Sequence, residues 1–241
     1  MTESSGRTPD GRLTLSATRQ KLPRRLAAGA RPHGLAPNEL VKLHHTLVEA
    51  LDSAGCAVAQ FVAPDPDAGI EAVVYDLAYV SAAWLGKRVL YVNGTSMRFD
   101  GMERVPSSRR EPVLTGQDDF NGMEHGITRV VGMELYQMVF PSLRGALDLA
   151  PTLRHMPDFL TRLRQSFDLV LIASPPASQA PVGLLLSRFV DGNVLVLEAG
   201  RTRAPVAVEL RDSLSASGGA VIGAVLTRYR SSVPSFLSRW L

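Results

Sequence analysis

The chain has 241 residues, of which 45% are hydrophobic, and a formal net charge of +3 at pH 7. This length and composition indicate an ordinary globular chain with room for one substantial core, and they exclude a fibrous or wholly disordered protein. We find no run of about 20 apolar residues that could span a bilayer and no apolar leader at the amino terminus. The single cysteine, Cys56, excludes an intrachain disulfide and fits a reducing cytoplasm.

The charge is concentrated at the amino terminus. Residues 1–36 contain seven Lys or Arg and two acidic residues, a net +5, so the rest of the chain sums to −2. This stretch is also rich in Pro, Gly, Ser and Thr. We expect a disordered basic arm that either keeps the chain soluble or is attracted to an anionic membrane surface or an acidic partner. Nucleic acid is not an expected partner, because the other residues show no basic stripe interleaved with aromatics.

Hydrophobic patterning predicts helices that alternate with short strands. A helix-start signal at residues 37–39 precedes an apolar face at three- and four-residue spacing, formed by Leu40, Leu43, Leu47 and Leu51. Strands are predicted at 57–63, 89–92, 134–140, 167–173, 194–197 and 220–226, with helices at 69–86, 151–165 and 203–217 and a short one after residue 176. This order predicts an α/β fold, a doubly wound and mostly parallel sheet with helices on both faces.

The turn from residue 64 to residue 71 follows the first strand at its carboxyl end, where such sheets bind ligands. In P-loop proteins this corner ends Gly-Lys-Ser/Thr, so that the Lys reaches the phosphates and the hydroxyl binds Mg²⁺. Here Gly69 is followed by Ile70 in the Lys position and by Glu71 in the hydroxyl position. A carboxylate at that point repels phosphate, so the turn predicts the architecture of a P-loop with a degenerate Walker A motif.

Three segments of the chain, around residues 66–71, 86–95 and 167–176, match in order and spacing the motifs of a known family. Through them the chain resembles the cytoplasmic domain of the BY-kinases, the bacterial tyrosine kinases of exopolysaccharide and capsule synthesis. These kinases belong to the wider MinD/ParA-like group of P-loop ATPases, and the resemblance runs from about residue 39 to the C-terminus. The family's Pro-Gly-Glu-Gly-Lys-Ser/Thr corresponds to residues 66–71, PDAGIE, and its Gly-Lys-Arg-Val-Leu to residues 86–90, GKRVL. The Asp-x-Asp motif that should follow is replaced by Asn93 and Thr95.

The third motif of the family reads Tyr/Phe-Asp-x-Val-Ile-Ile-Asp-Thr-Pro-Pro and corresponds to residues 167–176, FDLVLIASPP. Here Ala173 replaces the second Asp, and Thr227 stands where the family has the Asn that helps to recognise adenine. The resemblance therefore implies a nucleotide site whose positions are degenerate: Pro66, Asp67, Gly69, Ile70, Glu71, Asn93, Thr95, Ala173, Pro175, Pro176 and Thr227. Because phosphoryl transfer depends on the missing Lys and Mg²⁺ ligands, we predict that the chain is not an enzyme and has no catalytic residue, cofactor or metal.

Glu71 has a hypothesis of its own. It would lie in the first turn of a helix, whose N-terminus carries about half a positive charge. We expect its carboxylate either to replace a bound phosphate there or to be an ordinary surface group.

Two surfaces are predicted to bind other proteins. The family's ring-forming Glu-x-x-Arg-x-x-Arg corresponds to Glu39, Lys42 and His45, so contacts at this helix are expected to differ from those of the family. The adjacent His44 and His45 point apart and do not predict a metal site. Near the C-terminus four apolar side chains share one helical face, which either packs on the domain or docks on a membrane or membrane protein: Phe236, Leu237, Trp240 and Leu241.

Together these features predict three parts, a basic arm at 1–36, a kinase-like domain at 37–230 and a tail at 231–241. The resemblance implies a pseudokinase that regulates or scaffolds exopolysaccharide or capsule synthesis and export through protein–protein contacts, in the cytoplasm and peripheral to the inner face of the cytoplasmic membrane. The implied partner is a membrane protein of the chain-length-determinant or export type, with a homo-oligomer left open. The alternatives are an enzyme or sensor that binds another small ligand at the strand-end crevice, and a MinD/ParA-like positioning scaffold.

Overall fold

The structure, a computed structural model, describes residues 35–51, 55–95, 127–140 and 146–228. Most of the predicted arm and all of the predicted tail, including Phe236, Leu237, Trp240 and Leu241, lie outside the described residues. The division into arm, domain and tail therefore stays a prediction. Within the described residues, no helix combines the length and apolar character needed to cross a membrane.

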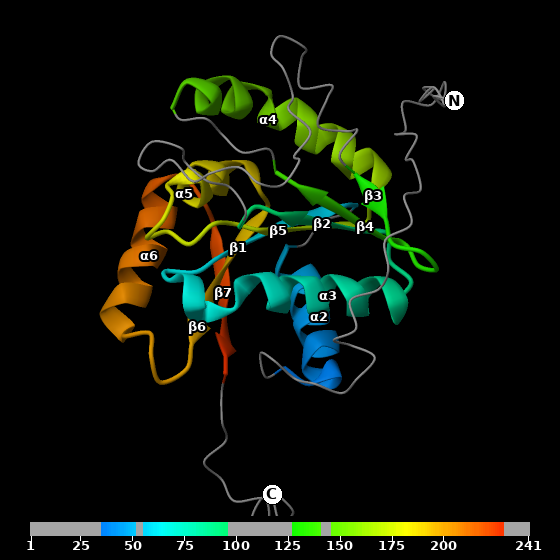
Figure 1. The fold of residues 1–241 in the computed structure, drawn as a ribbon, viewed down its shortest axis with the longest axis horizontal. Coiled ribbons are helices and arrows are strands. Elements are labelled where there is room, and N and C mark those ends of the chain that lie inside the picture. Colours follow the sequence, from blue (N-terminus) through cyan, green and yellow to red (C-terminus); the bar gives the residue numbers. More distant parts are fainter. Residues whose placement is uncertain (1–34, 52–54, 96–126, 141–145, 229–241) are drawn as a thin grey trace, which may run out of the picture.

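One sheet of seven strands forms the centre of the molecule (Figure 1), in the order β3-β4-β2-β5-β1-β6-β7. The strands are β1 Ala57–Val62, β2 Val89–Asn93, β3 Thr128–Arg129, β4 Leu135–Val139, β5 Leu169–Ala173, β6 Gly192–Glu198 and β7 Val221–Thr227. All neighbours are parallel except β3 and β4. Every residue of β1 is buried, as expected for a strand covered on both faces. The predicted fold class is confirmed.

Helices cover both faces of the sheet. They are α2 Pro37–Leu51, α3 Ile70–Ala83, α4 Ala146–Ser166, α5 Val182–Leu186 and α6 Ala204–Ala216, with 3₁₀ turns at Pro66–Ala68 and Ser187–Phe189. The helices α2 and α3 lie on one face, and α4, α5 and α6 lie on the other (Figure 1). The predicted apolar face of α2 packs mainly against α3, with Leu40 and Leu47 buried in the cluster on this face of the sheet.

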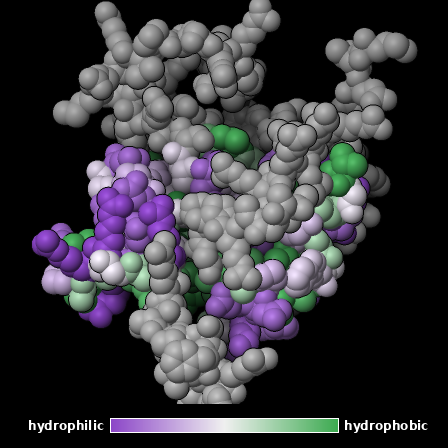
Figure 2. All heavy atoms as spheres, turned by 60° about the horizontal axis from the view of Figure 1, so that its bottom comes forward, coloured by the Kyte–Doolittle hydropathy of each residue, from purple (hydrophilic) through white to green (hydrophobic). Residues whose placement is uncertain are grey.

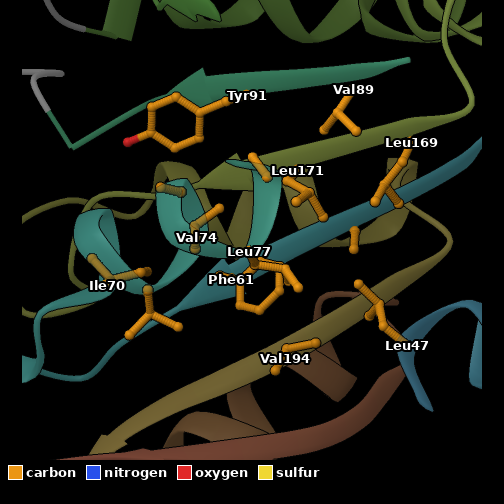
Figure 3. Packing of buried hydrophobic residues seen from close by; sticks show 14 of the residues in the cluster. Leu47, Phe61, Ile70, Val74, Leu77, Val89, Tyr91, Leu169, Leu171 and Val194 are labelled. Carbon is orange, nitrogen blue, oxygen red and sulfur yellow. The ribbon is translucent and has the colours of Figure 1, made fainter. Parts of the chain in front are cut away.

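Alternation along the strands divides the core into two main layers. Leu169 and Leu171 of β5 face α3, where they pack with Phe61, Val74 and Leu77 (Figure 3). The residues between them on β5 belong to the cluster beneath α4. Each such side chain stabilises the fold by about 1.5–3 kcal/mol when it leaves water. The packing on both faces therefore fixes the positions of the strands and of the loops at their ends.

The structure differs from the predicted elements in two places. The antiparallel strand β3 lies between the strands predicted at 89–92 and 134–140, where no strand is predicted; it has only two residues, too few to show alternation. The helix α4 begins at Ala146 rather than at residue 151. Other boundaries differ by one to three residues.

The surface of the described residues is mixed. On the face shown in Figure 2, hydrophilic side chains form broad areas and hydrophobic ones appear in separate smaller areas. Single exposed apolar side chains of this kind are ordinary in soluble folds.

Candidate functional site at the carboxyl ends of the strands

The turn after β1 forms a sharp corner that leads into α3. It forms a 3₁₀ turn over Pro66–Ala68, and Gly69 then adopts a φ of 72°. Glycine reaches this left-handed conformation without steric cost, which explains its place before α3. Ile70, in the position of the family's Lys, is only 3% exposed and belongs to the hydrophobic core. The site therefore has no ammonium at this position.

The same turn is held in place by the ends of β6 and β7. Thr227 is fully buried, and its Oγ1 donates a hydrogen bond to the Ala68 carbonyl oxygen at 2.8 Å. Arg201, in the loop after β6, forms an ion pair with Asp67 at 2.9 Å. Both of those side chains are exposed, so the pair contributes little. Thr227 thus occupies the adenine-recognition position of the resemblance and binds the turn itself.

Glu71 lies in the first turn of α3 and reaches the end of β2. Its Oε1 accepts a hydrogen bond from Asn93 Nδ2 at 2.9 Å, and its Oε2 lies 3.4 Å from Thr95 Oγ1. The Thr95 hydroxyl has a shorter acceptor in Asn93 Oδ1, at 2.6 Å. No ion pair joins Glu71 to a residue in the part of the chain that the structure describes. The structure thus brings three of the predicted site residues together around a carboxylate without a cationic partner.

The second and third motifs meet where β2 and β5 end. Asn93 is the register partner of Ala173, and the Gly94 amide donates to the Ala173 carbonyl oxygen at 2.8 Å. A Cβ on Gly94 would lie 2.8 Å from that same oxygen, so only glycine fits there. Pro175 and Pro176 follow as buried residues. The spacing read from the sequence therefore does bring these segments side by side.

Tyr91 is a polar residue of this site that the motif comparison missed. It is 4% exposed, and its hydroxyl has no hydrogen-bond partner among the described residues. Its ring stacks edge to face on Tyr75 at 5.4 Å. Burial raises the pKa of Tyr91 far above its usual value, and the Glu71 carboxylate adds to this rise. Figure 3 shows the hydroxyl pointing along β2 toward its carboxyl end.

The sequence contains one signal that points to Tyr91, its spacing from Asn93. Tyr91 lies two residues before Asn93 on the same strand, so both project to the same face of the sheet. A motif comparison does not use this alternation.

The structure shows where the predicted contact residues on α2 lie. Lys42 and His45 are exposed, and they lie away from the strand-end site. The neighbouring His44 is buried instead, with Nδ1 2.8 Å from Ser81 Oγ. Because the Ser81 hydroxyl donates to the Leu77 carbonyl oxygen, His44 must be the donor in that contact. Burial lowers the pKa of His44 to about 4, with His45 and Lys87 adding to the shift.

A cavity of about 530 Å³ lies at the opposite end of the sheet, where β1, β2 and β5 begin. Its lining includes His44, Cys56, Lys87, Arg88 and Asp168. Burial raises the pKa of the Cys56 thiol to about 12. The cavity is lined by the first residues of two motif segments, including Arg88 and Asp168, but not by the strand-end residues Glu71, Asn93 and Ala173. We place the candidate site at the carboxyl ends, because α/β sheets bind their ligands there.

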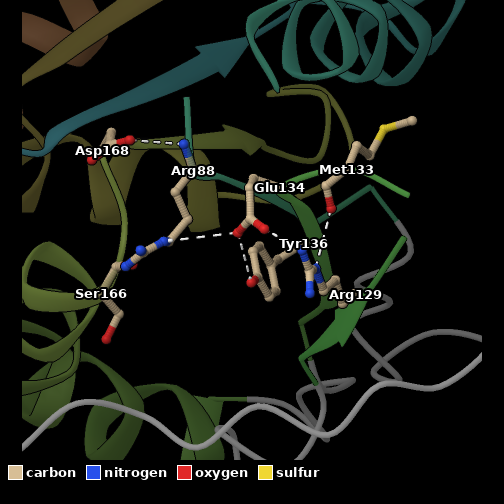
Figure 4. A network of polar contacts seen from close by, with 7 residues as sticks. All are labelled: Arg88, Arg129, Met133, Glu134, Tyr136, Ser166 and Asp168. Atoms are coloured by element: carbon tan, nitrogen blue, oxygen red, sulfur yellow. Dashed lines mark hydrogen bonds and ion pairs between the residues drawn. The ribbon is translucent and has the colours of Figure 1, made fainter. Parts of the chain in front are cut away.

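Charged groups at the amino ends of the strands are paired with one another (Figure 4). Arg88 donates its backbone N–H to Asp168 at 2.8 Å and a guanidinium N–H to the Ser166 carbonyl oxygen at 3.0 Å. Glu134 accepts from Arg129 and from the Tyr136 hydroxyl. In the described ranges, no group of three or more His, Cys, Asp or Glu residues could hold a metal ion.

Solved structures share this fold. The kinase domain of the Escherichia coli tyrosine kinase Etk is similar with a TM-score of 0.65 and 18% identity, over 92% of this chain and 94% of that one. The BceF tyrosine kinase domain is similar with a TM-score of 0.62 and 22% identity, over 83% and 80%. MinD from Pyrococcus horikoshii, in complex with Mg-ADP, has a TM-score of 0.50 and 19% identity, over 76% of each chain. No family model and no curated protein sequence matches the chain.

These structures correct one prediction. The chain was predicted not to be an enzyme, but the domains that share its fold over most of its length are kinases, which are enzymes. The prediction of a non-enzyme was based on substituted side chains in the motifs, and it is wrong, because the matching domains with this fold are enzymes. The resemblance itself is matched by the structural neighbours. The chain has the fold of tyrosine kinase domains and of MinD-like ATPases.

Proposed function

We propose that the chain is a tyrosine-kinase-like subunit of bacterial exopolysaccharide or capsule production. It regulates or scaffolds that machinery through protein–protein contacts at the inner face of the cytoplasmic membrane. The observation that carries the proposal is the match to a tyrosine kinase domain over 92% of the chain. The partner is a membrane protein of the chain-length-determinant or export type, as the resemblance implies.

The contacts at the strand ends support a role through association. Side chains at the kinase positions bind one another: Glu71 accepts from Asn93, and Thr227 donates to the Ala68 carbonyl oxygen. On the sheet face that carries α2, Lys42 and His45 are exposed and free to meet another protein. A charged helix surface of this kind suits a specific, salt-dependent contact.

The proposal is tested by deleting the gene in its native host and measuring polysaccharide output and recovery of the chain with membranes. Complementation uses the intact chain, a Lys42→Glu/His45→Glu variant and an Arg211→Glu variant as the matched control on exposed α6. We expect the double variant to lose output and membrane recovery while the control keeps both. Unchanged output after gene deletion would overturn the proposal. Incubation of the same preparations with MgATP, followed by phosphotyrosine detection, determines whether phosphoryl transfer is part of the role.

A second candidate is an enzyme or sensor for another small ligand at the strand-end crevice. One observation favours it: the buried Tyr91 hydroxyl points toward that crevice without a hydrogen-bond partner among the described residues. Native mass spectrometry of the chain purified from its host tests this candidate. A bound small molecule that is lost in a Tyr91→Phe variant supports it, and a ligand-free spectrum opposes it.

A further inference from the structure

The last strand of the sheet, β7, has an open edge. It pairs with β6 on one side, and no strand of the described residues lies on the other. The strand reads VIGAVLT, without a charge or a proline. Proteins usually protect such an edge with charged residues, prolines or a covering element, because free backbone groups there bind any extended chain. Within the described ranges no strand pairs with this edge and β7 itself carries no charge or proline, so its backbone groups can accept a partner strand.

The part of β7 that can pair outward has defined ends. A register shift opposite Asn193 and Val194 places a bulge at the start of β7, around Ile222. At the other end Arg228 has a φ of 54°, a left-handed conformation that ends the strand. A regular stretch of five residues, 223–227, remains between the two.

The direction of the backbone groups within this stretch follows from one hydrogen bond. The Thr227 carbonyl oxygen accepts from the Ala199 amide at the end of β6. Backbone groups point to alternate sides along a strand, so Gly223, Val225 and Thr227 turn toward β6. Ala224 and Leu226 therefore turn their N–H and C=O groups to the open edge. The two outward residues are placed symmetrically about Val225.

We propose that this edge pairs with β7 of a second copy of the chain, antiparallel and centred on Val225. Ala224 of one copy then lies opposite Leu226 of the other, and the two residues exchange both backbone hydrogen bonds. By symmetry the contact forms twice, as a two-fold axis requires. The two sheets continue as one across the axis.

Side chains support a second copy as the occupant. Ala224 and Leu226 are the register partners of Leu195 and Leu197, which pack with α6. Leu226 is 50% exposed, and opposite it a second copy places the small Ala224. The strand has no charge, so two copies meet without repulsion. A strand pair alone is smaller than a stable interface of about 1,000 Å². A dimer therefore needs further contacts beside the strand pair.

The oligomeric state of the full chain provides the first test. Light scattering or sedimentation at concentrations up to about 100 µM, where a micromolar dimer is populated, is expected to show a dimer. Leu226→Lys should weaken the dimer at least tenfold. The matched control is Val139→Lys, which changes a 59% exposed valine of β4 at the far side of the sheet. A monomeric unmodified chain, as expected if the edge binds another protein, overturns the proposal. Equal behaviour of the two Lys variants overturns it as well.

Cysteine pairs test the register. Residues opposite each other in a hydrogen-bonded antiparallel pair have Cα atoms about 5.5 Å apart, within reach of a disulfide. We expect a cross-linked dimer when Ala224→Cys and Leu226→Cys chains are mixed and oxidised, and none when either chain is oxidised alone. The native Cys56 contributes little background, because its thiol is partly buried and its pKa is raised to about 12. A cross-link in Ala224→Cys alone, or none in the mixture, contradicts pairing about Val225.

Discussion

The two ends of the sheet differ in how completely the described residues pair their polar groups. At the amino ends, Arg164 binds Asp191 and Glu134 binds Arg129 and Tyr136. At the carboxyl ends, the Glu71 carboxylate accepts from the neutral amide of Asn93, and none of the described residues forms an ion pair with it. There, too, the Tyr91 hydroxyl is buried without a described partner. Ion pairs such as that of Arg201 with Asp67 occur at the carboxyl ends too, so the difference lies in Glu71 and Tyr91, which the described residues leave without a cation and without a hydrogen bond to the hydroxyl. Polar groups of this kind are typical of functional sites.

The largest effect is expected at the amino ends, from Asp191→Ala. Asp191 accepts from the Val58 amide at 2.8 Å and from both guanidinium nitrogens of Arg164. Its loss leaves an amide and a partly buried charge without a partner, so the free energy of unfolding should fall by about 2–3 kcal/mol in urea denaturation. The control Asp212→Ala breaks an exposed pair with Arg211 and should change stability by less than about 0.5 kcal/mol. Equal losses would mean that the two ends do not differ as described.

The second effect depends on pH and also concerns the amino ends, where His44 lines the cavity. In the folded chain, burial lowers the pKa of His44 from its usual value of 6.5 to about 4. Below pH 6.5 the unfolded chain binds a proton that the folded chain does not, so stability falls as pH decreases from 6.5 toward 4. We expect a loss of about 2 kcal/mol between pH 7 and pH 5. The variant His44→Asn, which can still donate to Ser81, should lack this part of the pH dependence. A loss of the same size in the variant would assign the dependence to other groups.

The third effect concerns the hydrogen bond from Thr227 to the turn after β1. Thr227→Val keeps the shape of the side chain but removes the donor to the Ala68 carbonyl oxygen, so stability should fall by about 1–1.5 kcal/mol. Thr161→Val is the control, because its hydroxyl also donates to a backbone carbonyl, that of Pro157, but at the surface. Water replaces that bond, and a change of less than about 0.5 kcal/mol is expected. A neutral Thr227→Val would show that the turn keeps its shape without this bond.

The smallest effect is expected for Glu71→Gln. Loss of the negative charge in the first turn of α3 should lower stability by about 0.3–1 kcal/mol at low salt, and less at high salt. The control Glu209→Gln removes an exposed charge beyond the first turn of α6 and should have no comparable effect. If the two variants have the same denaturation midpoint, Glu71 is an ordinary surface residue and the contrast between the two ends weakens.

Much of the fold could be predicted because most strands are buried on both faces. The strands β1 and β5 read as short apolar runs bounded by turn residues, and a parallel sheet follows from such runs between helices. The meeting of Asn93 with Ala173 also follows, since parallel strands end on the same edge. The contact of Glu71 with Asn93 could not be predicted, because it depends on the rotamers of two side chains that lie 22 residues apart.

Other features of the site were not foreseen for physical reasons. Ile70 was read as a lost Lys, whereas the structure shows a core side chain whose burial stabilises the start of α3. His44 was considered only for metal binding, since nothing in its spacing shows that Ser81 lies opposite it. Activity was the weakest inference, because substituted side chains say which contacts are missing and do not say which reactions the remaining ones allow.

The bond between Asp191 and Val58 joins residues 133 positions apart, at the middle of the sheet. Strand β1, the most buried strand, pairs with β5 and β6, which are made more than a hundred residues later. During synthesis the apolar β1 therefore leaves the ribosome long before either neighbour exists. Closing such long loops is slow, and an exposed apolar strand is prone to aggregate while it waits. The order of the strands thus leaves β1 exposed to aggregation until residues 169–198 have been made.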